Sequence, residues 1–501
     1  MNPYEQNHFL LAAILLLPML GALVIALAPN PLGGRVPQAI AAAFAGLEMI
    51  LVGVMAANFV PSASRANTFE FMDKLSWIPQ FNIQYQVAVD GLSLPMVVLT
   101  ALLMFVAVLA SGTITKNPKL YFVLLMVLES AVIGVFTSLD LFLFFVMWEL
   151  ELIPMYFLIG MFGGKNREYA AMKFILYTGL ASALMLIVFL SIYFLNPAHT
   201  FDFLALQGTK VFSQYAGWVQ VLAFAALLVC FAVKLPMVPF HTWLPDAHVE
   251  APTAVSVLLA GVLLKMGAYG MIRFNLGLFG LEAAKPLLTT LAVLAVINIV
   301  YGAFLALAQT DIKRVIAYSS ISHMGFVLLG IAAMNQIGLN GAVLMMFSHG
   351  LITAMLFLFV GVIYDRTHTR EIKELGGLAA IMPTAGAIFV FTAMANVGVP
   401  GLSGFAGEFL VFLGAFQSFQ ALTIVAATSL VLTAAYTLWL TQRVWFQALP
   451  DRWAKLTDLN GVEAFNLLVL AAGVLVLGIY PALLTDVINP ATTKLVALLG
   501  V

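Results

Sequence analysis

The chain has 501 residues, of which 63% are hydrophobic and only 9% are charged, and its mean hydropathy is +1.05. A soluble domain of this length cannot bury so much apolar surface, so the composition excludes a water-soluble fold and indicates a polytopic membrane protein. The formal net charge of −1 provides no basic surface for nucleic acid. The single cysteine, Cys230, excludes an intrachain disulfide and an all-cysteine iron–sulfur site in this chain.

Fourteen apolar windows are long enough, at about 20 residues each, to cross a bilayer as helices, which predicts an all-α membrane fold. The first window lies close to an Ala-Leu-Ala sequence that resembles a signal-peptidase site. It is long, however, and the residues before it lack Lys and Arg, so we interpret it as a retained helix. The windows span residues 8–28, 37–60, 90–111, 119–138, 140–162, 170–195, 216–235, 252–275, 286–308, 312–334, 338–364, 379–399 (resuming at 405–417), 421–442 and 463–487.

Two of these helices, the seventh and the twelfth, are predicted to be broken. The first break contains Pro236 and Pro239, each of which removes a backbone donor and displaces a helical turn. The second contains Pro400, Gly401, Gly404 and Gly407 in the sequence NVGVPGLSGFAGEF. Broken backbone at membrane depth is tolerated where it faces protein or water, and paired breaks at matching positions are typical of inverted-repeat transporters.

The breaks predict two inverted five-helix repeats, in residues 119–280 and 281–446, in which the fourth helix of each is interrupted. Residues 1–118 would form three N-terminal helices with an outside loop, and residues 447–501 a loop and the last helix. Fourteen Lys and Arg residues fall on the side reached after odd-numbered helices, against six on the other side. The positive-inside rule therefore places both termini on the non-cytoplasmic side. The long outside loop, about 61–89, is expected to be a surface cover rather than a domain.

Ionisable residues within the predicted spans are costly, at roughly 2.5–3.5 kcal/mol each for a charged group at a helix centre, and are functional candidates for that reason. Lys234, Lys265, Glu149 and Glu408 are the strongest candidates. Glu151 follows Glu149 by two residues, and residues two apart on a helix do not share a face, so we favour Glu149, beside Trp148, as the acid that faces a channel. A structural role, by pairing with a neighbouring helix or by extension to the interface, is the alternative for each group. It is the favoured one for Glu48, Glu129 and Glu151.

Three histidines could exchange protons near neutral pH. His323 and His349 lie deep in the tenth and eleventh windows, and His241 follows the first break. A neutral histidine bonded to a serine or a carbonyl is the competing interpretation for the two deep residues. A metal site formed by His241, His248 and Asp246 does not match a zinc spacing. Because acids and bases alternate along the spans, proton movement is favoured, and a solute permease is the alternative.

The chain also resembles the antiporter-like subunit M of complex I, which is called chain 4 in other members of the family and has a photosynthetic version. The motifs that carry this resemblance span most of the chain: VDGLSLPMVVLT, LFLFFVMWELELIPMYFLIGMFGG, KFILYT, FAVKLPMVPFHTWLPDAHVEAPTAVSVLLAGVLLKMGAYG, LAQTDIKRVIAYSSISHMGFVLLGI and VPGLSGFAGEFLVFLGAF. The resemblance implies a proton-pumping membrane-arm subunit of an NAD(P)H– or ferredoxin–quinone oxidoreductase that binds no cofactor of its own. The complex would use quinone, iron–sulfur clusters and NAD(P)H or ferredoxin in other subunits.

By the same resemblance, the partners would be other antiporter-like subunits, the quinone-site subunits and the lipid bilayer. WELELIPMY, KFILYT and LLKMGAYG resemble cyanobacterial and chloroplast versions most, which implies plastoquinone and ferredoxin, in a thylakoid membrane or otherwise a bacterial inner membrane. A multi-subunit cation/proton antiporter shares the fold and is the alternative function. A purely structural scaffold of the membrane arm is a third.

The resemblance further implies the role of each site residue. Glu149 matches the glutamate that pairs with the lysine at Lys234, and Lys265 matches the central lysine. His323 and His349 match histidines of the central axis, and Glu408 matches the glutamate of the twelfth helix. Glu151 does not belong to that pattern. The resulting hypothesis is that Lys234 releases a proton toward Lys265 when its acid partner moves away, and that the proton leaves through the histidines and Glu408.

Overall fold

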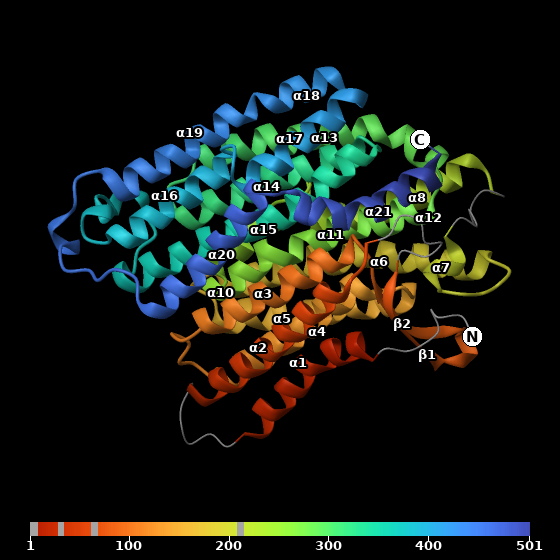
Figure 1. Ribbon diagram of the computed structural model, residues 1–501, viewed down its shortest axis with the longest axis horizontal. Coiled ribbons are helices and arrows are strands. Elements are labelled where there is room, and N and C mark those ends of the chain that lie inside the picture. Colours follow the sequence, from red (N-terminus) through yellow and green to blue (C-terminus); the bar gives the residue numbers. More distant parts are fainter. Residues whose placement is uncertain (1–8, 29–34, 62–68, 208–214, 501) are drawn as a thin grey trace.

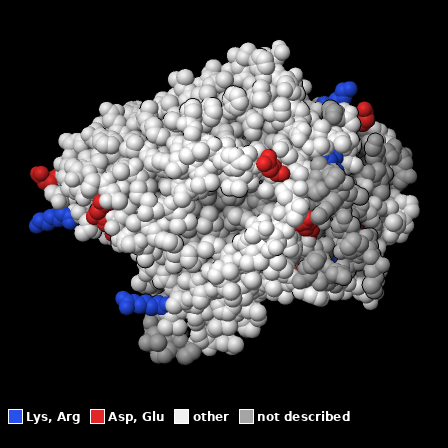
Figure 2. Space-filling model, in the orientation of Figure 1, with Lys and Arg blue, Asp and Glu red and all other residues white. Residues whose placement is uncertain are grey.

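The computed structural model describes residues 9–28, 35–61, 69–207 and 215–500, and these form a bundle of long helices. Figure 1 shows the helices running side by side along the long axis of the molecule, with the short strands β1 and β2 at one end and the loop before α20 at the other. We call these two ends the hairpin end and the opposite end. On the face shown in Figure 2, Lys and Arg lie toward the two ends, and the broad surface between them is almost uncharged, as a lipid-facing surface would be.

The N-terminal and first five-helix regions contain α1 (Leu10–Leu27), α2 (Arg35–Asn58), α3 (Ser93–Ala110), α4 (Pro118–Thr137), α5 (Leu141–Phe162), α6 (Arg167–Leu195), α7 (Phe203–Leu206), α8 (Gly217–Lys234), α9 (Trp243–Glu250), α10 (Thr253–Leu258), α11 (Leu264–Gly270) and α12 (Leu276–Leu278). The second region contains α13 (Leu281–Leu307), α14 (Ile312–Ala332), α15 (Gln336–Thr367), α16 (Pro383–Val397), α17 (Ser403–Ser418), α18 (Gln420–Ala427) and α19 (Ser429–Thr441), and α20 (Gly461–Ile479) and α21 (Ala482–Leu499) follow.

Within the described residues, fourteen helical segments are long and apolar enough to cross a membrane, which confirms the predicted fold class. The set of helices that make up the fourteen differs from the prediction in one respect. The twelfth window is divided into the short helices α16 and α17, whereas α21, which we did not predict as a separate helix, is long enough to count. The spanning helices follow one another along the chain in the predicted order. The proposed domain boundaries stay a prediction.

Both predicted breaks are present. Between α8 and α9 the chain leaves the helix at residues 235–242, and the side chain of Asn298 on α13 bonds the freed backbone there. Its amide oxygen accepts from the Val238 N–H at 2.6 Å, and its Nδ2 donates to the Pro236 carbonyl at 3.2 Å. Between α16 and α17, Gly398 and Gly401 adopt φ of +81° and +91°, a backbone region that side chains rarely allow.

The eighth span is interrupted in a different way, by two π-helical turns, Leu259–Leu263 and Met271–Asn275, between α10, α11 and α12. A π-helical turn leaves backbone carbonyls out of the regular hydrogen-bond ladder and is frequent at functional sites. Residues 254–278 of this span and residues 338–363 of α15 are all buried in the bundle. The two helices that hold Lys265 and His349 therefore form the centre of the structure.

Residues 70–89, in the described part of the predicted 61–89 loop, form regular structure that we did not predict. Residues Glu70–Ile78 (β1) and Ile83–Val89 (β2) form an antiparallel hairpin in which Glu70 pairs with Val89 and Ile78 with Ile83. Asp73 of β1 accepts hydrogen bonds from the backbone N–H groups of Phe9 and Ala12, at 2.8 and 3.0 Å, and so caps the start of α1. The hairpin therefore fastens the first helix to the rest of the hairpin end.

Candidate functional site

The lysine at the first break is paired with a buried acid. Lys234 is the last residue of α8, and its ammonium forms an ion pair with Glu151 of α5; both side chains are buried. The rings of Trp148 and Phe174 lie 5.6 and 5.2 Å from the lysine nitrogen, so part of its environment is aromatic rather than aqueous.

The acid in this pair differs from the one that we expected. The sequence favoured Glu149 as the partner of Lys234, but the structure makes the contact through Glu151. Successive residues are rotated by about 100° around a helix axis, so two positions turn a side chain by roughly 200°. Glu149 is consequently only half-buried and lies beside Ser182 of α6, and its Oε1 has no hydrogen-bond partner among the described residues.

The central lysine lies next to the first π-helical turn. Lys265 of α11 donates a hydrogen bond of 2.5 Å to the Ala260 carbonyl, which belongs to that turn. Its nitrogen also lies 2.7 Å from Nδ1 of His349 on α15. While Lys265 is the donor, His349 accepts at Nδ1 and is neutral, so the pair is arranged for a proton to pass directly from the lysine to the histidine.

The line continues from His349 to the second break. The rings of His349 and His323 are 5.5 Å apart between centroids, and His323 Nδ1 lies 3.6 Å from Glu408 Oε1. Glu408 lies in the second turn of α17, and a Cβ atom at Gly398 would be 2.5 Å from its Oε2. The glycine at the break therefore provides the space that the carboxylate occupies. Four predicted residues from four helices form one continuous series.

Two further histidines have different positions. His241 lies in the first break, where its ring packs against Tyr301 of α13 at 5.7 Å, and the described contacts do not join it to the series. His248 of α9, which we did not select, is fully buried, stacks on Phe357 at 4.6 Å and lies near Lys265 and His349. Neither of its ring nitrogens has a partner among the described residues. The signal that could have found it is a histidine six residues after the break, in a short helix that packs its ring against Phe357 of the central helix α15.

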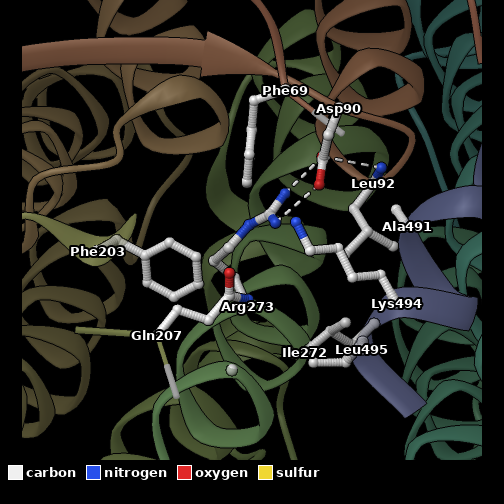
Figure 3. A pocket seen from close by; sticks show the side chains of 11 residues that line it. Phe69, Asp90, Leu92, Phe203, Gln207, Ile272, Arg273, Ala491, Lys494 and Leu495 are labelled. Atoms are coloured by element: carbon white, nitrogen blue, oxygen red, sulfur yellow. Dashed lines mark hydrogen bonds and ion pairs between the residues drawn. The ribbon is translucent and has the colours of Figure 1, made fainter. Parts of the chain in front are cut away.

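A separate ion pair closes the hairpin end of the eighth span (Figure 3). Arg273, in the second π-helical turn, donates to both oxygens of Asp90 at 2.8 and 2.5 Å and to the Tyr269 hydroxyl at 3.1 Å. Lys494 of α21 also points toward this pair. Burial raises the pKa of Asp90, but the guanidinium and the Ser93 and Leu92 N–H groups outweigh it, so the pKa lies below its usual range. The pair joins the segment between β2 and α3 to the eighth span, and Lys494 of the C-terminal helix lies beside it.

The described residues contain no group of three or more His, Cys, Asp or Glu side chains placed to hold a metal ion. Paired broken helices around a buried series of lysine, histidine and glutamate define an antiporter-like polytopic membrane subunit.

Comparisons with known proteins identify the family. Residues 138–433 match the family described as NADH:quinone oxidoreductase/Mrp antiporter, TM, and the chain belongs to this family. It is 47% identical over 495 residues to an NAD(P)H-quinone oxidoreductase chain 4 of Synechococcus elongatus, covering 97% of this chain and 91% of the relative. It is 43% identical over 500 residues to the NADH-quinone oxidoreductase subunit M of Rhodobacter capsulatus, covering 97% and 96%.

Solved structures agree with this assignment. A chain of respiratory complex I from Thermus thermophilus superimposes with a TM-score of 0.88 at 28% identity, covering 98% of this chain and all of that one. A chain of the Mrp complex from a Dietzia species superimposes with a TM-score of 0.85 at 22% identity, covering 98% and 99%, which shows a shared fold.

Proposed function

We propose that the chain is a proton-translocating membrane-arm subunit of a complex I-type NAD(P)H– or ferredoxin–quinone oxidoreductase. The observation that carries this proposal is the continuous series Lys265–His349–His323–Glu408, which crosses four helices and ends beside the second break. The relatives named chain 4 and subunit M support it, because they match over almost the whole chain.

The proton would move in steps between neighbouring groups. Lys234 holds its proton while an acid is close, because at about 4 Å and an effective dielectric constant near 20 the pair is stabilised by roughly 4 kcal/mol. Separation of the pair removes that stabilisation and releases the proton toward Lys265. Lys265 passes it to His349 across 2.7 Å, and rotation of the imidazoles or an intervening water carries it through His323 to Glu408.

The energy source would lie in other subunits. This chain would bind no redox cofactor, and quinone, iron–sulfur clusters and NAD(P)H or ferredoxin would be bound elsewhere in the complex. Its partners would be other antiporter-like and quinone-site subunits. The identity to cyanobacterial chain 4 supports plastoquinone and a thylakoid membrane over a bacterial inner membrane, and the distribution of Lys and Arg supports non-cytoplasmic termini.

The test is Lys234→Ala in the assembled complex, reconstituted in proteoliposomes. Proton translocation per electron should fall, because the variant lacks the side chain that releases a proton toward Lys265. Glu282→Gln, at an exposed acid in the first turn of α13, is the matched control and should leave the yield unchanged. A normal proton yield in the Lys234 variant would refute the proposed function and favour a structural scaffold.

A cation/proton antiporter subunit is the second candidate, favoured by the fold that the chain shares with the Mrp complex. Purification from native membranes separates the two. Co-purifying iron–sulfur and quinone-site subunits support the first function, and ferredoxin-docking or carbon-uptake subunits would identify the photosynthetic version. Rescue of growth in sodium by the chain, without quinone reductase activity, would support the second function.

A further inference from the structure

A single side chain from the second five-helix region holds the first break. Asn298 of α13 is fully buried, its amide oxygen accepts a hydrogen bond of 2.6 Å from the Val238 N–H, and its Nδ2 donates to the Pro236 carbonyl at 3.2 Å. An asparagine amide offers one acceptor oxygen and two donor hydrogens, so one residue satisfies both a freed N–H and a freed carbonyl. At membrane depth each of these groups would otherwise be costly.

The same amide also binds α14. The Nδ2 of Asn298 donates to the Ile321 carbonyl at 3.3 Å. In the opposite direction, the hydroxyl of Ser322 donates to the Ile299 carbonyl of α13 at 2.7 Å. Ile321 and Ser322 are the two residues before His323. Two reciprocal hydrogen bonds therefore join α13 to α14 directly before a member of the proton series.

The helices α13 and α14 are packed too closely to slide past one another. A Cβ atom at Gly302 of α13 would lie 2.8 Å from the Ser322 nitrogen. On the other side of the contact, a Cβ atom at Gly325 of α14 would lie 2.8 Å from the Ile299 nitrogen. Close-packed interiors of this kind transmit a displacement rather than absorb it. Because α8 packs against α13 and α9 packs against α14, the first break rests on a rigid pair of helices.

The position of Lys234 depends on how this break is held. Lys234 is the last residue of α8, and Val238 follows it by four residues. The Nε1 of Trp243, at the start of α9, donates to the Val233 carbonyl at 2.9 Å, so the far side of the break is fastened to the same helix end. The last turn of a helix frays where the chain beyond it is free to move. A fixed break therefore keeps the ammonium of Lys234 against Glu151.

We propose that Asn298 is a positioning residue of the proton path, which holds the first break, and with it Lys234, in a fixed place relative to His323. This rests on the proposed function. The amide of Asn298 carries no proton of the path itself and acts through Lys234. A displacement of about 1 Å in a reacting group can lower a rate by about 10²-fold, so loss of the amide should slow the transfer from Lys234 without removing any titratable group.

Two substitutions of Asn298 in the intact complex, reconstituted in proteoliposomes, test this. Asn298→Leu branches at the same carbon but forms no hydrogen bonds, whereas Asn298→Gln keeps the amide on a stem that is one carbon longer. The yield of protons per electron should fall in the leucine variant and recover at least in part in the glutamine variant. A role in packing alone predicts the reverse order, because the longer glutamine overfills the buried site. A normal yield in the leucine variant, or a glutamine yield that does not exceed the leucine yield, contradicts the proposal.

A matched control and a double variant separate positioning from general stability. Asn275→Leu removes a buried amide that donates a hydrogen bond of 2.9 Å from the eighth span to the Phe224 carbonyl of α8. It should lower the melting temperature but leave the proton yield unchanged, and a fall in yield equal to that of Asn298→Leu would overturn the proposal. Asn298→Leu combined with Lys234→Ala should pump no less than Lys234→Ala alone, because effects that pass through one residue do not add. A further fall in the double variant would show that Asn298 acts elsewhere.

Hydrogen–deuterium exchange of residues 235–242 gives a structural readout that is independent of pumping. In the unmodified complex the segment should exchange as slowly as α8, and exchange at the rate of an open loop overturns the proposal. In Asn298→Leu its exchange should become at least about tenfold faster, since one net hydrogen bond changes an opening equilibrium by about that factor; unchanged exchange contradicts the clamp. If the leucine variant does not assemble, Asn298→Gln decides the matter, because a yield no higher than that of Lys234→Ala also overturns the proposal.

The two proposals fail in different ways. If Lys234→Ala pumps normally, the proposed function is wrong whatever the Asn298 variants show. If Lys234→Ala lowers the proton yield but Asn298→Leu pumps normally, the proposed function stands and the role of Asn298 is wrong.

Discussion

Replacement of Glu408 by glutamine tests the end of the proton series most directly. The carboxylate oxygen lies 3.6 Å from His323 Nδ1, and both side chains are buried. At that distance and an effective dielectric constant of about 20, an ionised Glu408 stabilises a protonated His323 by roughly 4–5 kcal/mol. Glutamine has nearly the same shape but no charge, so the population of protonated His323 should fall by a factor on the order of 10³.

The expected result is a complex that assembles but translocates fewer protons per electron. Proton uptake and quinone reduction are measured together in proteoliposomes, because the ratio separates lost pumping from lost electron transfer. Glu408→Asp keeps the charge and should retain part of the pumping, and Glu282→Gln serves as the surface control. A glutamine variant with the normal ratio would refute the reasoning, since no other carboxylate was assigned to receive the proton from His323.

Three further variants test the scaffold. Asp90→Asn should destabilise the protein by about 3–5 kcal/mol, seen as a lower melting temperature, because it leaves Arg273 buried without a counter-charge. Since the pKa of Asp90 is lowered in the folded state, the stabilisation from this pair should be complete above about pH 4 and be lost only as the pH falls further. Burial raises the pKa of Asp140, the N-cap of α5, to about 6. Because the folded state then binds a proton more tightly than the unfolded state, the free energy of unfolding should fall by about 3 kcal/mol as the pH rises from 4 to beyond 6. Asp140→Asn keeps the cap and should remove that pH dependence from thermal unfolding curves. Gly341→Ala would place a Cβ 2.6 Å from the Val411 nitrogen where α15 and α17 pack together. The substitution should lower the free energy of unfolding by about 1–3 kcal/mol and reduce pumping, because it displaces α17. An unchanged melting temperature and proton yield would contradict that packing.

The fold was largely predictable from the chain itself. Apolar windows identified almost every span, because helix length and hydrophobicity are set by the thickness of the bilayer. The prolines at 236 and 239 and the glycines near 401 located both breaks, since these residues act on the backbone locally. The hairpin within 61–89 was missed, and its pairing contains register shifts that nothing in the sequence indicated.

The eighth span has features that the sequence could not predict. Its two π-helical turns have no signature such as proline, so nothing in the sequence indicated that the Ala260 carbonyl would be free to accept a hydrogen bond from Lys265. The fully buried His248 was overlooked for a related reason. Its proximity to Lys265 and His349 depends on how the segment after the first break returns toward the eighth span.

The sequence by itself determined which residue types lie at membrane depth and where the helices are interrupted, because hydrophobicity and backbone chemistry act over a few neighbouring residues. Only the tertiary structure decided which of those residues touch. Glu149 and Glu151 are separated by two positions, and the choice between them as partner of Lys234 depends on the rotation of α5 about its own axis, which its packing against α4 and α6 sets. Glu408 likewise meets His323 because α17 packs against α14 and α15. A proton series of this kind is specified by its residues but assembled by helix packing.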